Sequence, residues 1–375
     1  MISNRRWDPC IYHRGDPADA FLQEYLSIPD RRVLLIAGAG FDPRSTRVAQ
    51  AVVASAADRV RALLIREERP DPSPSLVKLA DANHARLIEL IPSSEVQRIA
   101  VFASDDAVVG GRSAARLIST VSLADVSDVF VDVSALSIGV AFPVINYLHT
   151  TISRSDTPCN LHVVCCDDPQ LDRGIQSKCA ATAAAIHGFR GEWGLDSKSR
   201  AAILWMPLLS AGKGEALRRI FQALQNVQKD TVVCPILPFP ASNPRASDEL
   251  IEEFSQELQI AWQVDARDLV YAHEGRPLDL YRTILKIDEK RRRIFESVGG
   301  SQIILSPLGS KALSLGALMA ALDRPFTILY VESIGYSLGA QMAGRVDSAT
   351  SGELVHIWLH GDVYGSSYAT ERGRT

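Results

Sequence analysis

The chain has 375 residues, which is long enough for one large domain or two of ordinary size. Hydrophobic residues make up 46% of it and charged residues 22%, a balance that is too apolar for a disordered chain. The formal net charge of -4 at pH 7 argues against a broad basic surface, so extended nucleic acid is not an expected partner.

Cysteines and apolar runs indicate the compartment. The six cysteines form no CxxC pair and are too few for a disulfide framework in a chain of this length. Cys165 and Cys166 lie in an apolar run and are predicted to be small core residues of a strand. The N-terminus is not followed by an apolar stretch of signal-peptide length, and no uninterrupted apolar run approaches the roughly 20 residues that span a bilayer. We therefore expect a cytoplasmic protein without a membrane partner.

In the first half, short apolar runs alternate with helical patterns. Strand, helix and strand at this spacing predict parallel strands joined by crossover helices. The strands are continuous apolar runs, which is typical of a sheet covered on both faces. Residues 31–168 are thus predicted to form a Rossmann-like half, preceded by an N-terminal arm, 1–30. The expected strands are 32–37, 60–65, 96–103, 128–133 and 161–166, and the expected helices 45–60, 75–88, 107–119 and 138–151.

Residues 169–200 interrupt this alternation and are interpreted as an insertion or a junction, with an alanine-rich helix at 177–186 and a loop at 187–194. The alternation then resumes, and 201–375 is predicted to be a second Rossmann-like half. The fold class expected from both halves is α/β with mostly parallel sheets. The second half has expected strands at 202–209, 231–237, 302–305, 326–331 and 353–359, an extended segment at 261–271, helices at 214–225, 248–258, 278–298 and 311–322, a rigid loop at 238–244, and a C-cap at Gly299-Gly300.

The first candidate site is a glycine turn between a strand and a helix. Glycine lets the backbone approach a ligand closely, and the helix N-terminus offers free N–H groups. Asp42 could cap the helix or hold a ribose hydroxyl, and Arg44 could bind a phosphate or carboxylate. The alternative is a structural turn, because Pro43 stands where a dinucleotide fingerprint has its third glycine. The candidate ligand residues are Gly38, Gly40, Phe41, Asp42, Arg44 and Ser45.

This turn resembles two families. Sirtuins have a similar glycine-alanine-glycine turn, and class I methyltransferases, especially relatives of leucine carboxyl methyltransferase, have one followed by Asp and Arg, as in Gly38 to Arg44. These resemblances imply an NAD-consuming or an adenosyl-methionine-dependent enzyme. The sirtuin motif with the catalytic histidine has no counterpart that we can place. The second half shows no obvious match to the antiparallel strand pair that closes the methyltransferase sheet.

The second candidate site, Ser306 to Lys311, also joins a strand to a helix. A lysine at a helix N-terminus opposes the helix dipole unless an anion is bound, so Lys311 indicates a phosphate or an acidic ligand. The alternative is a structural turn with a solvated lysine. The candidate ligand residues are Ser306, Gly309, Ser310 and Lys311.

Residues 303–332, which contain this turn, resemble the ligand loop of CRISPR-associated Rossmann-fold sensors. In those sensors a strand, a turn and a small-residue helix hold a cyclic oligonucleotide. Ser310 stands where they usually carry threonine, and Pro307-Leu308 replaces their paired glycines. The resemblance implies a nucleotide-like ligand and a role in bacterial antiviral defence.

Further candidates are weaker. His273 beside Glu274 could act as an acid–base pair, and the loop at 238–244 is expected to converge with them at the sheet edge of Ser310. Loop packing is the alternative for both. No P-loop, HExxH or GxSxG motif is present, and no metal site is expected. The additional candidate ligand residues are Glu67, Asp132, Asn243, Arg245 and Arg282.

The expected function is binding of a nucleotide or nucleotide-like ligand across both halves, as a sensor or as a subunit of a bacterial defence or signalling assembly. Asp42 would bind a hydroxyl, and Arg44 and Lys311 would bind phosphate. One alternative is a methyltransferase or NAD-consuming enzyme that uses the turn from Gly38 to Arg44. Another is a scaffold whose helix 278–298 binds a protein partner or a second copy of the chain. No particular cofactor is assigned.

Overall fold

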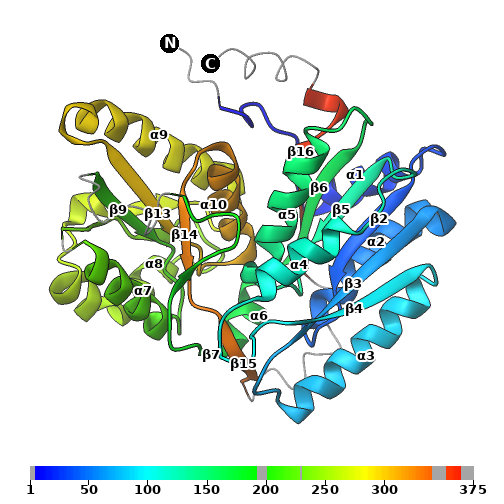
Figure 1. The fold of residues 1–375 in the computed structure, drawn as a ribbon, viewed down its shortest axis with the longest axis horizontal. Helices are drawn as coiled ribbons and strands as arrows, with labels where there is room; N and C mark the ends of the chain where they lie inside the picture. The colour runs from blue at the N-terminus through cyan, green and yellow to red at the C-terminus, as the bar shows by residue number, and fades with distance from the viewer. Residues whose placement is uncertain (1–4, 192–200, 229, 340–351, 365–375) are drawn as a thin grey trace. The chain divides into compact units, whose positions relative to one another are not determined.

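Two α/β units make up the computed structural model, which describes residues 5–191, 201–228, 230–339 and 352–364 (Figure 1). Unit 1 consists of Met1–Asp168 and Gly344–Thr375, and unit 2 is Pro169–Ala343. Both contain parallel strands joined by helices, so the predicted fold class of two Rossmann-like halves with mostly parallel sheets is confirmed.

The sheet of unit 1 has seven strands in the order β1-β16-β6-β5-β2-β3-β4. The five strands from β6 to β4 are parallel, and in chain order they give the Rossmann arrangement 3-2-1-4-5. The order reverses between β2 and β5, and ligands of such sheets bind outside the carboxyl ends of the strands at this point. The strands are β1 (Tyr12–Arg14), β2 (Val33–Gly38), β3 (Val60–Glu68), β4 (Ser94–Ala100), β5 (Asp128–Asp132), β6 (Asn160–Asp167) and β16 (Glu353–His360).

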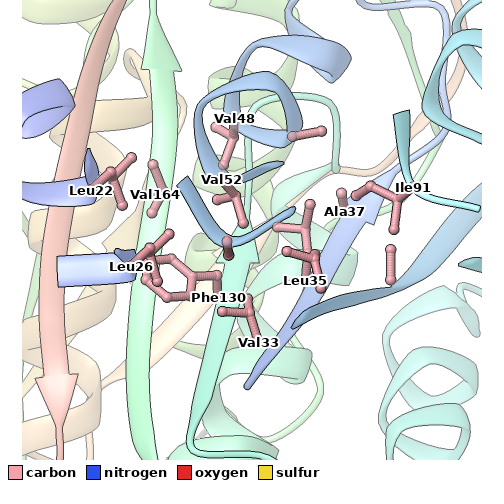
Figure 2. Packing of buried hydrophobic residues seen from close by; sticks show 14 of the residues in the cluster. Leu22, Leu26, Val33, Leu35, Ala37, Val48, Val52, Ile91, Phe130 and Val164 are labelled. Atoms are coloured by element: carbon pink, nitrogen blue, oxygen red, sulfur yellow. The ribbon is translucent and has the colours of Figure 1, made fainter. Parts of the chain in front are cut away.

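Helices cover both faces of this sheet. The core on one face lies between the strands and α1, α2 and α3, where Leu26 and Val52 pack with Leu35, Phe130 and Val164 (Figure 2). The alternate side chains of the same strands are buried on the other face, beside α4 and α5. The helices are α1 (Asp16–Leu26), α2 (Arg47–Ala56), α3 (Pro74–Leu90), α4 (Gly110–Ser119) and α5 (Ile138–Ile152). Cys165 and Cys166 are fully buried in β6, as expected.

The unit boundaries differ from the predicted ones at both ends of the chain. The run 353–359 does not belong to the second half, because β16 lies antiparallel beside β6 in unit 1. The predicted arm, 1–30, contains β1 and α1, and β1 pairs antiparallel with β16. Unit 1 therefore has an antiparallel strand pair at its edge. An apolar run carries no signal for a partner so distant in sequence, and β1 is too short for its pattern to be recognised.

The main sheet of unit 2 has the order β10-β9-β13-β14-β8. Strands β10, β9, β13 and β14 are parallel, and a parallel bridge from Leu208 to Ile236 connects the parallel pair β11–β12 to the end of β9. The resulting order, β12-β11-β9-β13-β14, is again 3-2-1-4-5, with its reversal between β9 and β13. The strands are β8 (Ala184–Ala185), β9 (Ala202–Pro207), β10 (Val232–Val233), β11 (Ile236–Pro238), β12 (Val270–Ala272), β13 (Ser301–Ser306) and β14 (Thr327–Tyr330).

Five helices of unit 2 follow or connect these strands. The long charged helix ends as expected, because Gly299 adopts a left-handed conformation with φ 108° after a short 3-10 turn. The helix expected at 248–258 is α8 followed by a separate π-turn at Glu257–Ala261. The helices are α6 (Pro169–Gly174), α7 (Gly214–Val227), α8 (Ala246–Glu253), α9 (Pro277–Phe295) and α10 (Lys311–Asp323).

The alanine-rich helix predicted at 177–186 is wrong. This segment contains the end of β7 (Ile175–Cys179) and all of β8. β7 pairs antiparallel with β15 (Ser333–Leu338), and β8 pairs antiparallel with β14. Helix propensity is a weak preference that pairing with a distant strand can outweigh. The interpreted insertion is thus part of unit 2, and of the loop expected at 187–194 only 187–191 lie within the described residues.

Candidate functional site

The glycine turn of unit 1 lies at the strand-order reversal, between β2 and the 3-10 turn Pro43–Thr46. Gly38 is needed there for packing, because a Cβ at this position would lie 2.8 Å from the carbonyl carbon and oxygen of Ala135. Gly40 has more room, since its Cβ would lie 3.5 Å from the Ala135 oxygen. The turn after β5 therefore occupies the space that a ligand would need beside Gly38.

The charged residues of this turn bind each other. Arg44 donates from Nε to Oδ1 of Asp42 at 2.9 Å and from Nη2 to Oδ2 at 2.7 Å. Asp42 also caps the 3-10 turn by accepting from the Arg44 backbone N–H at 3.0 Å. Both side chains are buried, as is Ser45. Arg44 thus serves as a buried partner of Asp42, and the predicted phosphate contact would require this pair to open.

Asn83 of α3 holds the same turn from outside, because its Nδ2 donates to the carbonyl oxygens of Gly40 and Asp42 at 3.0 Å each. Phe41 between them is half-buried. Nothing in the sequence singled out Asn83, which lies on the buried face of an otherwise ordinary helix. The turn is therefore held by Asn83, by its own Asp42–Arg44 pair and by the turn after β5. These contacts fix its geometry without a ligand.

The two acidic candidates of unit 1 also have partners. Glu67 accepts from the Ser137 backbone N–H at 2.7 Å and from Arg69 at 2.6 Å, so it bridges the end of β3 to the start of α5. Glu67 is thus a half-buried strand end that two hydrogen bonds hold in place. Asp132 is 1% exposed and accepts from the N–H and hydroxyl of Ser134. Both carboxylates lie at the carboxyl edge of the sheet.

The second candidate turn occupies the corresponding position in unit 2. Ser306 ends β13 beside Pro207 of β9, and its hydroxyl accepts a hydrogen bond from the Trp205 indole at 2.9 Å. Gly309 packs against the side chain of Leu208, which follows β9. Ser310 caps α10 by accepting from the Leu313 N–H at 3.2 Å. The turns after β9 and β13 thus lie side by side at the strand-order reversal.

Two lysines belong to these adjacent turns. Lys213 is the N-cap residue of α7, and Lys311 is the first residue of α10. Both side chains are half-buried, and the Lys213 ammonium donates to the Ser177 hydroxyl at 2.9 Å. Burial lowers the pKa of Lys213, and the nearby positive charge of Lys311 lowers it further, against the opposite effect of Cys179 and Asp172. The two lysines therefore stand at the same edge of the sheet, where the positive charge of Lys311 acts on that of Lys213.

Sequence reasoning missed Lys213. The signal was present, because Gly212-Lys213-Gly214 stands between an expected strand and an expected helix, as Ser310-Lys311 does. Only the strand order shows that the two turns are neighbours, since β9 and β13 are far apart along the chain. The structure thus adds a second cation to the one predicted at this edge.

The loops that were expected to converge on Ser310 do so. The Ser310 hydroxyl contacts the carbonyl oxygen of Glu274 at 3.3 Å, and the Glu274 N–H donates to Pro240 O at 3.0 Å. The proposed acid–base pair is not assembled, however. The Glu274 carboxylate accepts from the Ser242 N–H, and the His273 ring accepts from the Gly275 N–H. Both side chains bind loop backbone instead of each other.

The remaining candidates lie on the surface of unit 2. Asn243 forms an Asx turn just before α8, in which its Oδ1 accepts from the Arg245 N–H at 3.0 Å, and its amide donates to Glu249. Arg245 and Arg282 are exposed. Asn243 thus has a structural role.

An exposed aromatic pair lies beside these loops. Phe239 follows β11 and Tyr271 lies in β12, and they are 54% and 48% exposed. Their ring centroids are 6.1 Å apart at an interplanar angle of 77°. The Phe239 N–H donates to Ala272 O at 2.8 Å, which joins this pair to the loop of Glu274 and Ser310. Large exposed rings in contact are common where a protein binds a planar group.

The part of the chain that the structure describes contains neither a cluster of metal ligands nor a helix that could span a membrane. No group of three or more His, Cys, Asp or Glu side chains there could hold a metal ion. None of the helices described is both long and apolar enough to cross a membrane.

Comparison with known proteins gives no family. No protein-family model matches the chain, and no curated protein is similar to it. One solved structure, titled "OtsA apo structure", is similar at 12% sequence identity over 89% of this chain and 72% of that one, with a TM-score of 0.27. A likeness at this TM-score carries no argument. The function proposed for this chain therefore depends on its own residues.

Proposed function

We propose that unit 2 binds a nucleotide or nucleotide-like ligand at the carboxyl edge of its sheet, with Lys213 and Lys311 on phosphate. The observation that carries this proposal is that the neighbouring strands β9 and β13 lead into turns that place Lys213 and Lys311 at the starts of α7 and α10. Each helix N-terminus adds a positive dipole end to these charges. Such an arrangement is unfavourable by itself and becomes favourable when an anion is bound.

The aromatic pair Phe239–Tyr271 supports a ligand that carries a base as well as phosphate. A base can stack on an exposed ring, and each such stack contributes about 1–3 kcal/mol. The loop of Glu274 lies between the aromatic pair and Lys311. Backbone hydrogen bonds join it to the segment of Phe239, and the Ser310 hydroxyl, just before Lys311, donates to the Glu274 carbonyl oxygen. Phosphate at the lysines and a base at the rings would place the two parts of one nucleotide along this edge.

A binding role is favoured over catalysis at this edge because His273 and Glu274, the candidate acid–base pair, are engaged by loop N–H groups. The resemblance of residues 303–332 to CRISPR-associated sensors supports a sensor in a bacterial defence or signalling assembly. Cyclic oligonucleotides are therefore the first ligands to test.

The test is isothermal titration of the full chain with ADP and with a cyclic oligonucleotide. Removing one of two charge-assisted phosphate contacts should weaken binding roughly tenfold, so we expect this loss in Lys213→Ala and in Lys311→Ala. The exposed Lys286 of α9 provides the matched control, and Lys286→Ala should bind as the unmodified chain does. Binding should also weaken as ionic strength rises.

A second arm separates base recognition from phosphate recognition. Phe239→Ala should weaken ADP binding by fivefold or more, since a stack worth about 1–3 kcal/mol is lost, and should leave inorganic pyrophosphate binding unchanged. Equal binding of ADP by Lys213→Ala, Lys311→Ala and the unmodified chain would contradict the site. Absence of any binding would favour a scaffold, with α9 as its partner surface.

A second candidate function is binding of adenosyl-methionine at the glycine turn of unit 1. The observation that favours it is the antiparallel pair β16–β1 beside β6, because class I methyltransferases close their sheet with an antiparallel strand pair. The buried Asp42–Arg44 pair and the contact of Gly38 with Ala135 oppose it. Thermal stabilisation by adenosyl-methionine, abolished in Gly40→Val, would support this candidate over the site in unit 2.

A further inference from the structure

A row of three histidines crosses the sheet of unit 1, outside the sites described above. His13 Nδ1 lies 3.1 Å from His356 Nδ1, and His356 Nε2 lies 2.9 Å from His162 Nδ1. His162 Nε2 lies 3.3 Å from Oδ1 of Asp128, where the row ends. His162, His356 and Asp128 are 0% exposed, whereas His13 at the other end is half-buried.

The strand register brings the four residues to one face of the sheet. His13 of β1 pairs with His356 of β16, and His162 of β6 pairs with Phe130 of β5. Aromatic rings hold the imidazoles in place. Phe21 of α1 stacks on His13 and on His356 with centroids 4.4 Å apart in both cases, and Phe130 stacks on His162 at 4.3 Å.

Asp128 sets the direction of every hydrogen bond in the row. An ionised carboxylate only accepts, so His162 must donate from Nε2, and its Nδ1 is then an acceptor. His356 must therefore donate from Nε2 and accept at Nδ1, and His13 donates from Nδ1. Three neutral imidazoles, each with one proton, satisfy all of these contacts.

An added proton can be held at the outer end but not further in. His13 has its Nε2 outside the row, so this half-buried ring can become a cation. A second proton would put two adjacent imidazolium rings in a buried site. Burial lowers the pKa of all three histidines, most strongly that of His356, which the charges of its two histidine neighbours lower further.

Other charged groups do not offset this penalty. Asp128 raises the pKa of His162, and Asp362 adds to this, but burial and Arg31 outweigh them. Tyr25 of α1 contributes a hydroxyl that donates to Asp128 at 2.7 Å. On β1, Arg14 is bound by Asp167 and Glu353. No carboxylate is bonded to His13 or His356 among the contacts that the structure describes.

We propose that the histidine row is an acid-sensitive latch that releases β1 from the edge of β16 as the pH falls below about 6.5, where an ordinary histidine takes up a proton. Once β1 has left, His13 and His356 face water and each can take up a proton, so the released state binds more protons than the closed state. Acid then favours release. β1 has only three residues, which makes its separation from the sheet inexpensive, and its departure uncovers the backbone edge of β16.

Hydrogen–deuterium exchange of the full chain at pH 7.5 and 5.5, corrected for intrinsic exchange rates, tests this latch. For each additional proton that the released state binds, the protection of peptides covering 11–16 and 353–360 should fall by about tenfold per pH unit. Peptides from β2 and β3, which lack buried histidines, should keep their protection. Equal protection of β1 at both pH values would overturn the proposal.

Two variants and one control complete the test. His13→Gln keeps a hydrogen-bond donor but cannot be protonated, and it should show a smaller loss of β1 protection at pH 5.5. His356→Phe, which fits between Phe21 and Phe130, should reduce the loss further if it folds. His187→Gln, at an exposed histidine of unit 2, should behave as the unmodified chain does. Retention of the full pH dependence in His13→Gln would refute the latch.

Discussion

Asp42 and Arg44 have an exposed counterpart in the same chain. Asp265 and Arg267 form the same arrangement two residues apart, with Nε on Oδ1 at 3.0 Å, Nη2 on Oδ2 at 2.9 Å and the backbone N–H on Oδ1 at 2.9 Å. The difference is burial, because Arg44 is 2% exposed whereas the Arg267 side chain is 88% exposed. The two pairs therefore separate the effect of burial from that of geometry.

We predict that Arg44→Met lowers the free energy of unfolding by about 3–5 kcal/mol, because it leaves the Asp42 carboxylate buried without its partner. Arg267→Met should have no measurable effect, since water replaces the lost contact. Urea denaturation of both variants at pH 7 provides the measurement. Similar losses in the two variants would show that the pair in unit 1 is not buried in solution.

At this scale the sequence predicted positions better than roles. Both turns and the carboxyl-edge location of Glu67 and Asp132 follow from strand–turn–helix patterns, which need only local information. The role of Arg44 could not be predicted in this way, because the burial of a side chain depends on residues that approach from elsewhere in the chain. Lys213 was missed for the same reason, because Lys311 belongs to the turn after β13, which is far away along the chain.

Among the elements, α9 and α10 make an unusually close contact. Gly316 lies in the middle of α10, and a Cβ there would lie 2.5 Å from the carbonyl oxygen of Pro277 and 2.9 Å from Cβ of Leu280. The two helices can approach this closely only because glycine has no side chain. This contact also fixes the start of α9, which follows the loop of His273 and Glu274.

Gly316→Ala should therefore destabilise unit 2 by about 1–3 kcal/mol, although alanine is the better helix former by about 1 kcal/mol. Gly214→Ala in α7 is the control, because the atom nearest its Cβ is the end of the flexible Arg218 side chain. This control should be neutral or slightly stabilising. Thermal unfolding of both variants checks the expectation, and a rise in the melting temperature of Gly316→Ala would mean that the helices separate without cost.

Most long elements could be predicted from sequence, and the errors have a common cause. Long apolar segments between turn residues, such as α5 and β13, were recognised because their patterns are local. β7 and β8 were taken for a helix, and β1 was left in an arm, because these short strands form by pairing with β15, β14 and β16. A pairing partner far away along the chain leaves no local pattern.

For the whole molecule, the path of the chain makes unit 1 discontinuous. The chain leaves unit 1 after Asp168, forms unit 2, and returns with β16 between β6 and β1. Sequence order alone suggested two consecutive halves, and nothing local in residues 353–360 indicates that they return to the first sheet. The folding of unit 1 thus depends on residues at both ends of the chain, whereas unit 2 is a single continuous segment.

This difference predicts how fragments behave. A fragment of residues 169–343 should fold and unfold cooperatively in urea, because all strands of its sheet are present. A fragment of residues 1–168 should not, since β1 would have no partner and β6, with the buried His162, would become an exposed edge. Adding a peptide of residues 344–375 to the second fragment should restore protection from hydrogen exchange in β6. Cooperative unfolding of 1–168 alone would show that the five parallel strands of unit 1 are stable without β16.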